Sequence, residues 1–226
     1  MKKDITIFFD CFGTLFSDPG IIDINSLLDT ILEIESPDKK FLSFLWNQCY
    51  REIEEQSRIS KIEFSMDDIA YKMSSLHEKY DLSTYQKIKE LYMEHWVEKI
   101  FLFPDVKEVL YKLSKRYYLG IISNTNDSKM IPELLEKHSI SSYFSYLVFS
   151  VDVGVKKPSP QIFDYAKRMC GNKILCYVGD NYFDDIDGAQ KSEILPIYIN
   201  REKKKIGDIN CIETMTELIG IIQQYQ

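Results

Sequence analysis

The chain has 226 residues, of which 45% are hydrophobic, so it has enough apolar side chains for a core and is not expected to be disordered. Its length suggests one large domain or a core domain that carries an insertion. The formal net charge of -7 argues against a general nucleic-acid-binding protein, but it does not exclude a phosphorylated substrate, because positive charge can be held locally inside a site.

The cysteines and the apolar runs bear on the cellular compartment. The five cysteines are an odd number with no C-x-x-C pair, which favours reduced thiols over a disulfide framework. The N-terminal apolar run stops at Asp10, too early for a signal peptide, and no stretch is long enough to span a bilayer. We therefore predict a cytoplasmic protein without a membrane or nucleic-acid partner, either a monomer or a homodimer.

The first predicted element is a strand over residues 5–9. Its sequence, Ile-Thr-Ile-Phe-Phe, is an apolar run typical of a buried strand in a parallel sheet. The run ends at Asp10, and a turn follows at Gly13 and Thr14. Parallel sheets place their chemistry at the carboxyl ends of strands. An Asp in this position can also only cap the next turn, so this stretch alone leaves the role of Asp10 open.

Residues 17–99 show apolar side chains at helical spacing and no strand signal. Pro37 is expected to end the first helix or to separate it from the second. We predict an all-helical insertion after the first strand. Its apolar stripes lie at 24–32, 41–53, 65–80 and 85–96.

From Pro104 onward, strands and helices alternate, which indicates βαβ units and a parallel sheet. We predict an α/β protein with a three-layer, Rossmann-like core made of residues 1–16 and 100–226. The short basic run 201–205 is interpreted as a solvated loop rather than a nucleic-acid patch. The predicted strands lie at 117–122, 143–151, 174–178 and 195–199, and the predicted helices begin near 104, 131, 160 and 215.

Four strand ends then bring polar side chains to one edge of this sheet. Carboxylates gathered so closely repel one another unless a cation lies among them, and a small set of oxygen ligands suits Mg²⁺. A lysine and a hydroxyl beside them suit an anion. A site with both properties suits phosphoryl transfer, in which an Asp can act as the nucleophile. The residues are Asp10, Ser123 with Asn124, Lys157, and Asp180 with Asp185.

The order of these residues resembles the haloacid dehalogenase-like (HAD) hydrolase superfamily, in the subgroup with a helical C1-type cap after the first motif. The resemblance covers residues 4 to about 200 and preserves the family's motif order, with the cap in the expected gap. The four motifs are Asp10-Cys11-Phe12-Gly13-Thr14-Leu15, Ile121-Ile122-Ser123-Asn124, Gly154-Val155-Lys156-Lys157-Pro158 and Gly179-Asp180-Asn181-Tyr182-Phe183-Asp184-Asp185.

The resemblance implies a catalytic set and a substrate-binding set. Asp10 would be the nucleophile that forms an aspartyl-phosphate, and Ser123 and Lys157 would hold the transferring phosphoryl group. Thr14 and Asn124 would shape the phosphate pocket, with Phe12 beside the substrate.

The resemblance also implies Mg²⁺ as the cofactor. The carboxylates of Asp10 and Asp180 and the backbone carbonyl of Phe12 would be its protein ligands. Asp185 would support the ion directly or by holding a ligand in place.

Phe12 departs from the pattern of the family's phosphatases. They usually carry a second Asp at this position, which protonates the leaving group and then activates water, and Phe cannot transfer a proton. General acid–base catalysis is typically worth about 10²–10⁴-fold. A phosphatase with Phe12 should therefore be slow with ordinary esters, or should favour leaving groups that need little protonation, such as acyl and aryl phosphates.

Three functions stay open at this point. The first is a Mg²⁺-dependent phosphatase of a small phosphorylated metabolite. The second is a haloacid dehalogenase, since family dehalogenases carry an aromatic residue where Phe12 stands; however, they lack the Gly179-Asp180 pair. The third is a catalytically weak or inactive binding protein on the same scaffold.

Overall fold

The computed structural model describes residues 4–20, 22–31, 34, 36–203 and 210–225. The chain divides into two compact units. Met1–Asp18 and Phe101–Gln226 make up an α/β unit, and Pro19–Ile100 make up a helical unit. All five cysteines are free thiols. Among the described residues, no helix is both long and apolar enough to cross a lipid bilayer.

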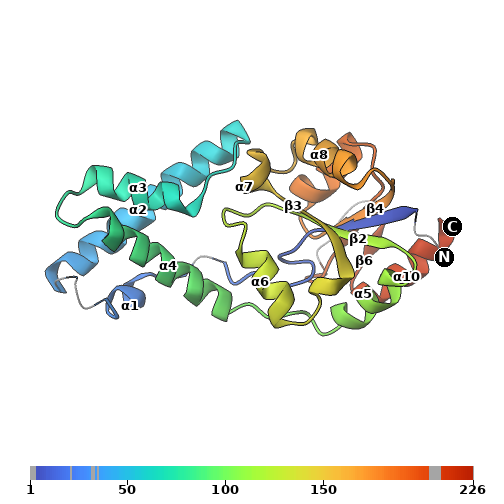
Figure 1. Cartoon of the computed structure of the whole chain (residues 1–226), viewed down its shortest axis with the longest axis horizontal. Helices are drawn as coiled ribbons and strands as arrows, with labels where there is room; N and C mark the ends of the chain where they lie inside the picture. The colour runs from blue at the N-terminus through green and yellow to red at the C-terminus, as the bar shows by residue number, and fades with distance from the viewer. Residues whose placement is uncertain (1–3, 21, 32–33, 35, 204–209, 226) are drawn as a thin grey trace. The chain divides into compact units, whose positions relative to one another are not determined.

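The α/β unit is built on a six-stranded sheet whose strands all pair in parallel (Figure 1). The strand order is β3-β2-β1-β4-β5-β6. The chain thus adds β2 and β3 on one side of β1 and then β4, β5 and β6 on the other side. Such switch points are where open parallel sheets hold their ligands. The predicted α/β class with a Rossmann-like parallel core is confirmed. The strands are β1 (Ile5–Phe9), β2 (Tyr118–Ser123), β3 (Phe144–Phe149), β4 (Lys173–Gly179), β5 (Pro196–Ile199) and β6 (Cys211–Ile212).

Helices cover both faces of this sheet, which accounts for strands that are almost continuously apolar. On one face, Phe163 and Ala166 of α8 (Pro160–Cys170) belong to the same buried cluster as Phe8 and Tyr177 of the sheet. On the other face lie α5 (Val106–Ser114) and α10 (Leu218–Gln224) (Figure 1). The remaining elements of the unit are α6 (Met130–Lys137), η1 (Ser141–Tyr143), α7 (Ser150–Val153), the π-helical turn η2 (Tyr182–Asp187), α9 (Gly188–Lys191) and η3 (Met215–Glu217).

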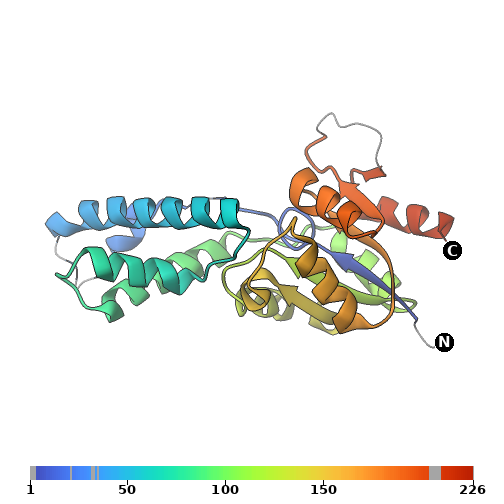
Figure 2. The same cartoon turned by 90° about the horizontal axis from the view of Figure 1, so that it is seen from above.

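The helical unit packs its helices around a core of its own. The longest helix, α2, lies alongside the others (Figure 2). Trp46 is buried at the centre against Tyr92, with ring centroids 4.9 Å apart. The third helix begins in a capping box between Ser65 and Asp68, which satisfies N–H groups that a helix start leaves unpaired. The helices are α1 (Asn25–Leu28), α2 (Ser36–Ser60), α3 (Met66–Leu76) and α4 (Leu82–Glu98).

The structure differs from the predicted elements at three places. The first helix is a single turn, α1, instead of 24–32. Pro37 agrees with the second of its two predicted roles: it lies in the first turn of α2, where a missing N–H leaves no helical hydrogen bond unmade, so it separates the second helix from the first instead of ending the first. The strand predicted over 143–151 ends at Phe149, and the next residues form α7. The two-residue strand β6 was not predicted, because it is too short to show a period.

Candidate active site

The candidate site lies at the carboxyl ends of the central strands. Asp10 follows β1 directly, and its backbone N–H donates to the Val178 carbonyl of β4 at 2.8 Å. Asp180 follows the end of β4, which is the neighbour of β1 in the sheet. Asp185 lies one turn further on, in η2. Two adjacent strand ends and one short helical turn thus supply three carboxylates.

A buried lysine connects two of these carboxylates. The Lys157 ammonium donates to Asp10 Oδ1 and to Asp185 Oδ1, each at 2.6 Å, and its side chain is 3% exposed. Asn124 holds the lysine backbone from two sides: Lys157 N–H donates to Asn124 Oδ1 at 2.7 Å, and Asn124 Nδ2 donates to the Lys157 carbonyl at 3.3 Å. The end of β2 therefore positions the loop that carries Lys157.

Asp10, Asp180 and Asp185 each present a carboxylate oxygen within 4.8 Å of the others, which is close enough for one cation to bind them together. Within the described part of the chain, Lys157 is the one cation that these three carboxylates face. Burial and then the charge of Asp185 raise the pKa of Asp180 to about 6, and burial holds the pKa of Asp10 well above its ordinary value despite Lys157. Burial alone would lower the pKa of Lys157, but the charges of Asp10 and Asp185 raise it instead. The site thus has surplus negative charge, which a divalent cation would offset.

The three carboxylates differ in how many of their oxygens accept a hydrogen bond from a described residue. Asp185 accepts hydrogen bonds on both oxygens, with Asn181 N–H donating to Oδ2 at 2.9 Å. Asp180 Oδ1 accepts from the Thr14 hydroxyl at 3.3 Å. Among the described residues, Lys157 is the one side chain that donates to Asp10. Asp10 and Asp180 therefore suit direct metal binding, and Asp185 suits a supporting place.

Two glycines make room for these carboxylates. A Cβ at Gly13, whose φ is +80°, would collide with the carboxylate of Asp180. A Cβ at Gly179 would collide with Asp185 in the same way. The two positions exclude any larger residue while the carboxylates keep these places.

The other predicted site residues have fewer contacts with the carboxylates and Lys157. The Ser123 hydroxyl is buried at the end of β2 and donates at 3.4 Å to the Asn124 carbonyl, not to Asp10 or Lys157. Phe12 is half-buried in the turn after Asp10, where its backbone forms an isolated β-bridge with Phe16. Thr14 contacts Asp180 and thereby belongs with the carboxylates. The phosphoryl contact of Ser123 and the metal contact of the Phe12 carbonyl stay predictions.

Sequence reasoning missed Tyr177. This fully buried residue of β4 accepts a hydrogen bond from Lys157 Nζ at 2.9 Å, and its hydroxyl lies 3.0 Å from Asp185 Oδ1. Tyr177 is one of several apolar and aromatic residues in a strand, and nothing in that pattern singles it out. Only the order and register of the strands show that it points into the site.

The basic run 201–205 was interpreted as a solvated loop, and for Arg201 this is wrong, whereas Lys204 and Lys205 lie outside the described residues. The Arg201 guanidinium binds both carboxylate oxygens of Asp105 at 3.2 Å and donates to the Thr14 carbonyl at 2.8 Å. It also stacks 3.8 Å from the centroid of the Phe103 ring. Arg201 thus holds the loop after Asp10 to the segment that returns to the α/β unit.

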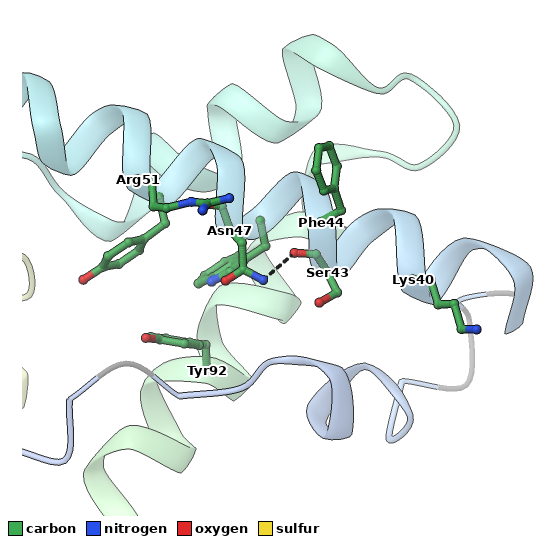
Figure 3. Close-up of a pocket in the computed structure, with 8 residues that line it drawn as sticks. Lys40, Ser43, Phe44, Asn47, Arg51 and Tyr92 are labelled. Carbon is green, nitrogen blue, oxygen red and sulfur yellow. Dashed lines mark hydrogen bonds between the residues drawn. The ribbon is translucent and has the colours of Figure 1, made fainter.

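The helical unit carries a separate groove of about 480 Å³ (Figure 3). Lys40 and Arg51 lie at the two ends of the part of α2 that lines it, and Tyr92 comes from α4. Among the described residues neither cation forms an ion pair, and no carboxylate lines the groove. It therefore combines positive charge with an aromatic surface. Its other lining residues are Ser43, Phe44, Trp46, Asn47 and Tyr50.

The parallel strand order and the carboxylates around Lys157 define a Rossmann-like α/β protein with an acidic site at the carboxyl ends of its central strands. The family profile "Haloacid dehalogenase-like hydrolase" matches residues 27–199, and the chain belongs to this family.

Three known proteins illustrate its range. The chain is 30% identical over 122 residues to the pyrimidine 5'-nucleotidase YjjG of Escherichia coli (strain K12), covering 53% of this chain and 54% of that protein. It is 25% identical over 210 residues to haloacetate dehalogenase H-2 of Moraxella sp. (strain B), covering 89% and 88%. The crystal structure of a 2-haloacid dehalogenase from Pseudomonas syringae pv. Tomato DC3000 superposes with a TM-score of 0.73 at 22% identity, over 100% of both chains, which shows the shared fold. The chain spans about half the length, or less, of the first curated relatives that it matches.

Proposed function

We propose that the protein is a Mg²⁺-dependent phosphatase that hydrolyses a small phosphorylated metabolite through an aspartyl-phosphate on Asp10. The observation that carries the proposal is the approach of Asp10, Asp180 and Asp185 to within 4.8 Å of one another. A dehalogenation needs no such cluster, because a halide leaves without charge stabilisation by a metal. A phosphoryl group needs a cation to offset its charge and a carboxylate to attack it.

Mg²⁺ would be held by Asp10, by Asp180 and by the carbonyl of Phe12, with Asp185 supporting them. The donor set is made of oxygens, as this hard cation requires, and the surplus negative charge of the cluster fits a divalent ion. When bound, the ion would neutralise charge on the phosphoryl oxygens and orient them toward Asp10.

Asp10 then acts as the nucleophile. Its carboxylate oxygen forms a bond to phosphorus while the bond from phosphorus to the leaving oxygen breaks, and the leaving group takes the electron pair. Lys157 would donate hydrogen bonds to the phosphoryl oxygens, together with Ser123. Water then attacks the aspartyl-phosphate, releasing phosphate and restoring Asp10. Phe12 supplies no proton, so the leaving group must take one from water or depart as an anion.

The helical unit would act as a cap that selects the substrate. Its groove offers cations and an aromatic surface, which suit a substrate with a planar body or a second anionic group. The nucleotidase among the relatives acts on molecules of that kind, and its similarity supports this substrate class.

A panel of phosphate compounds tests the proposal. Acetyl phosphate, p-nitrophenyl phosphate, pyrimidine nucleotides and sugar phosphates are assayed with Mg²⁺ and with EDTA. We expect turnover with Mg²⁺, fastest for acetyl and p-nitrophenyl phosphate, and none with EDTA. Asp10→Asn should abolish it, and Asp164→Asn, whose side chain on α8 is 49% exposed, should not. No turnover of any compound by the unaltered protein would contradict the phosphatase function.

The second candidate function is dehalogenation of a small haloacid. Two observations favour it: the aromatic Phe12, and the similarity to haloacetate dehalogenase H-2 over 88% of that protein's length. Incubation with chloroacetate or 2-chloropropionate distinguishes the two functions. Chloride release that persists in EDTA and disappears in Asp10→Asn would establish the dehalogenase.

A further inference from the structure

Tyr177 places its ring in the apolar core and its hydroxyl in the site. The ring packs edge-on against Phe163, with centroids 5.3 Å apart and planes at 84°. Its hydroxyl lies 2.9 Å from the carbonyl of Ile122 on β2, although β1 lies between β2 and β4 in the sheet. The side chain therefore ties two strand ends together across the strand that carries Asp10.

The hydrogen bonds of Lys157 are fully assigned. An ammonium has three N–H donors, and the structure gives Lys157 three acceptors. Two of them, Asp10 and Asp185, are charged and lie at 2.6 Å; the third is the neutral Tyr177 hydroxyl at 2.9 Å. This hydroxyl accepts from Lys157, so its own proton goes to the Ile122 carbonyl or to Asp185 Oδ1.

We propose that Tyr177 is a positioning residue that fixes the Lys157 ammonium toward a phosphoryl group on Asp10. This inference rests on the proposed phosphatase function. Charge attraction draws the ammonium toward the two carboxylates but sets its direction weakly, whereas the buried hydroxyl adds a directional contact on another side. When a phosphoryl oxygen accepts the N–H that now reaches Asp10, Tyr177 and Asp185 hold the other two.

In this arrangement the residue that reacts with phosphorus, Asp10, is not the only one that holds the Lys157 ammonium in place. When Asp10 attacks phosphorus, one of its oxygens becomes part of the new P–O bond and the carboxylate loses its negative charge, so its hydrogen bond with Lys157 weakens. The Tyr177 contact does not change during that step. The ammonium therefore keeps its place while its charged partner reacts.

The substitution Tyr177→Phe tests this role, because it removes the hydroxyl and keeps the ring. With p-nitrophenyl phosphate and Mg²⁺, we expect kcat to fall about tenfold and KM to change less than twofold, since loss of a direct transition-state donor typically costs about 10²–10³ in kcat and a displaced donor costs less. Tyr146→Phe is the matched control. Its hydroxyl lies at 3.4 Å from the Cys170 carbonyl and accepts from Asn172, away from Lys157, so kcat should not change.

A second measurement does not depend on activity. In protein labelled with ¹⁵N-lysine, the Lys157 ammonium signal is assigned by its loss in Lys157→Arg. We expect Tyr177→Phe to shift this signal and to speed its hydrogen exchange several-fold, and Tyr146→Phe to leave it unchanged. Thermal melting of both variants checks that the fold is intact.

The two proposals fail in different ways. A wild-type protein without phosphatase turnover contradicts the proposed function, and the ammonium signal then still decides whether Tyr177 fixes Lys157. A wild type that turns over, with unchanged kcat and unchanged ammonium exchange in Tyr177→Phe, overturns the role of Tyr177 alone.

Discussion

The carboxylate site of the α/β unit and the groove of the helical unit hold their cations in opposite environments. In the α/β unit, Lys157 is buried and meets two carboxylates and a hydroxyl. In the helical unit, Lys40 and Arg51 are exposed beside a groove that no carboxylate lines. A buried charge is stable only when groups of opposite charge or polar groups surround it, so removing a buried cation leaves its carboxylate partners as uncompensated buried charges. An exposed cation is solvated, and its removal affects mainly what it binds. Substitutions at the buried cation should therefore change folding, and those at the groove should change recognition.

The largest expected effect is that of Lys157→Met. The substitution leaves the buried carboxylates of Asp10 and Asp185 without their cation, and breaking a buried pair in this way typically costs about 3–5 kcal/mol in the free energy of unfolding. Urea denaturation in EDTA measures it. Lys191→Met is the control, because Lys191 pairs with Asp187 at the same distance of 2.6 Å on the surface, where a pair is worth about 0–1 kcal/mol. Equal losses in the two variants would contradict the comparison.

Phe12→Asp should restore the proton transfer that the chain lacks. We expect turnover of alkyl phosphate esters to rise by up to about 10²-fold, because general acid help is typically worth about 10²–10⁴-fold. Turnover of acetyl phosphate should change little, because its leaving group needs no proton. Phe12→Asn is the control, since it is as polar and as small but cannot transfer a proton. Equal turnover in the two variants would show that the missing proton is not the limitation.

Residues at strand ends could be predicted from the sequence, and residues inside strands could not. Asp10, Lys157 and Asp180 follow recognisable strands or turns, and parallel strands deliver their ends to one edge. Tyr177 lies within a run of apolar and aromatic residues. Only the sheet order shows that its hydroxyl reaches the Ile122 carbonyl on β2, on the other side of β1. Its role depends on a contact 20 residues away in sequence, with Lys157.

Arg201 shows a second limit of sequence reasoning. A short basic run is normally solvated, and the pattern contains no sign that one member pairs with Asp105. A helix was expected to begin near residue 104, and α5 does begin directly after Asp105. However, its carboxylate accepts from Arg201 and from the Met215 backbone, not from the first turn of α5. Local patterns predict elements well, whereas pairings between distant segments require the fold.

The surplus charge of the carboxylate cluster should appear as a pH dependence of the metal-free protein. The pKa of Asp180 is raised from 3.8 to about 6, so the folded state binds its proton more tightly than the unfolded state does. This contribution to stability is fully present below about pH 4 and is lost as the pH rises through 6. In EDTA at pH 7, Asp180→Asn should therefore melt at a higher temperature than the wild type.

Two controls sharpen this prediction. Mg²⁺ should raise the melting temperature of the wild type at pH 7 and should have little effect on Asp180→Asn, because that variant lacks one ligand. Asp81→Ala should show the opposite sign, since hydrogen bonds from Thr84 and Ser83 lower the pKa of Asp81 and its stabilising effect is present at pH 7. A lower melting temperature for Asp180→Asn in EDTA would contradict the view that the cluster is overcharged.

The smallest expected effect is that of Arg51→Ala at the groove. Arg51 is solvent-exposed, and its one described hydrogen bond goes to the Asn47 carbonyl in the preceding turn of α2, so its loss should leave the melting temperature nearly unchanged. If the groove receives an anionic part of the substrate, KM should rise about fivefold for phosphate esters with a second anionic group, since an exposed charge contact is worth up to about 1 kcal/mol. The value of kcat should not change, because Lys157 and the carboxylates are untouched. Arg58→Ala, near the end of α2 and outside the groove, is the control. A KM increase that is the same for esters with and without the second anion would show that the exposed cations do not select the substrate, and the difference between the two units would then lie in folding alone.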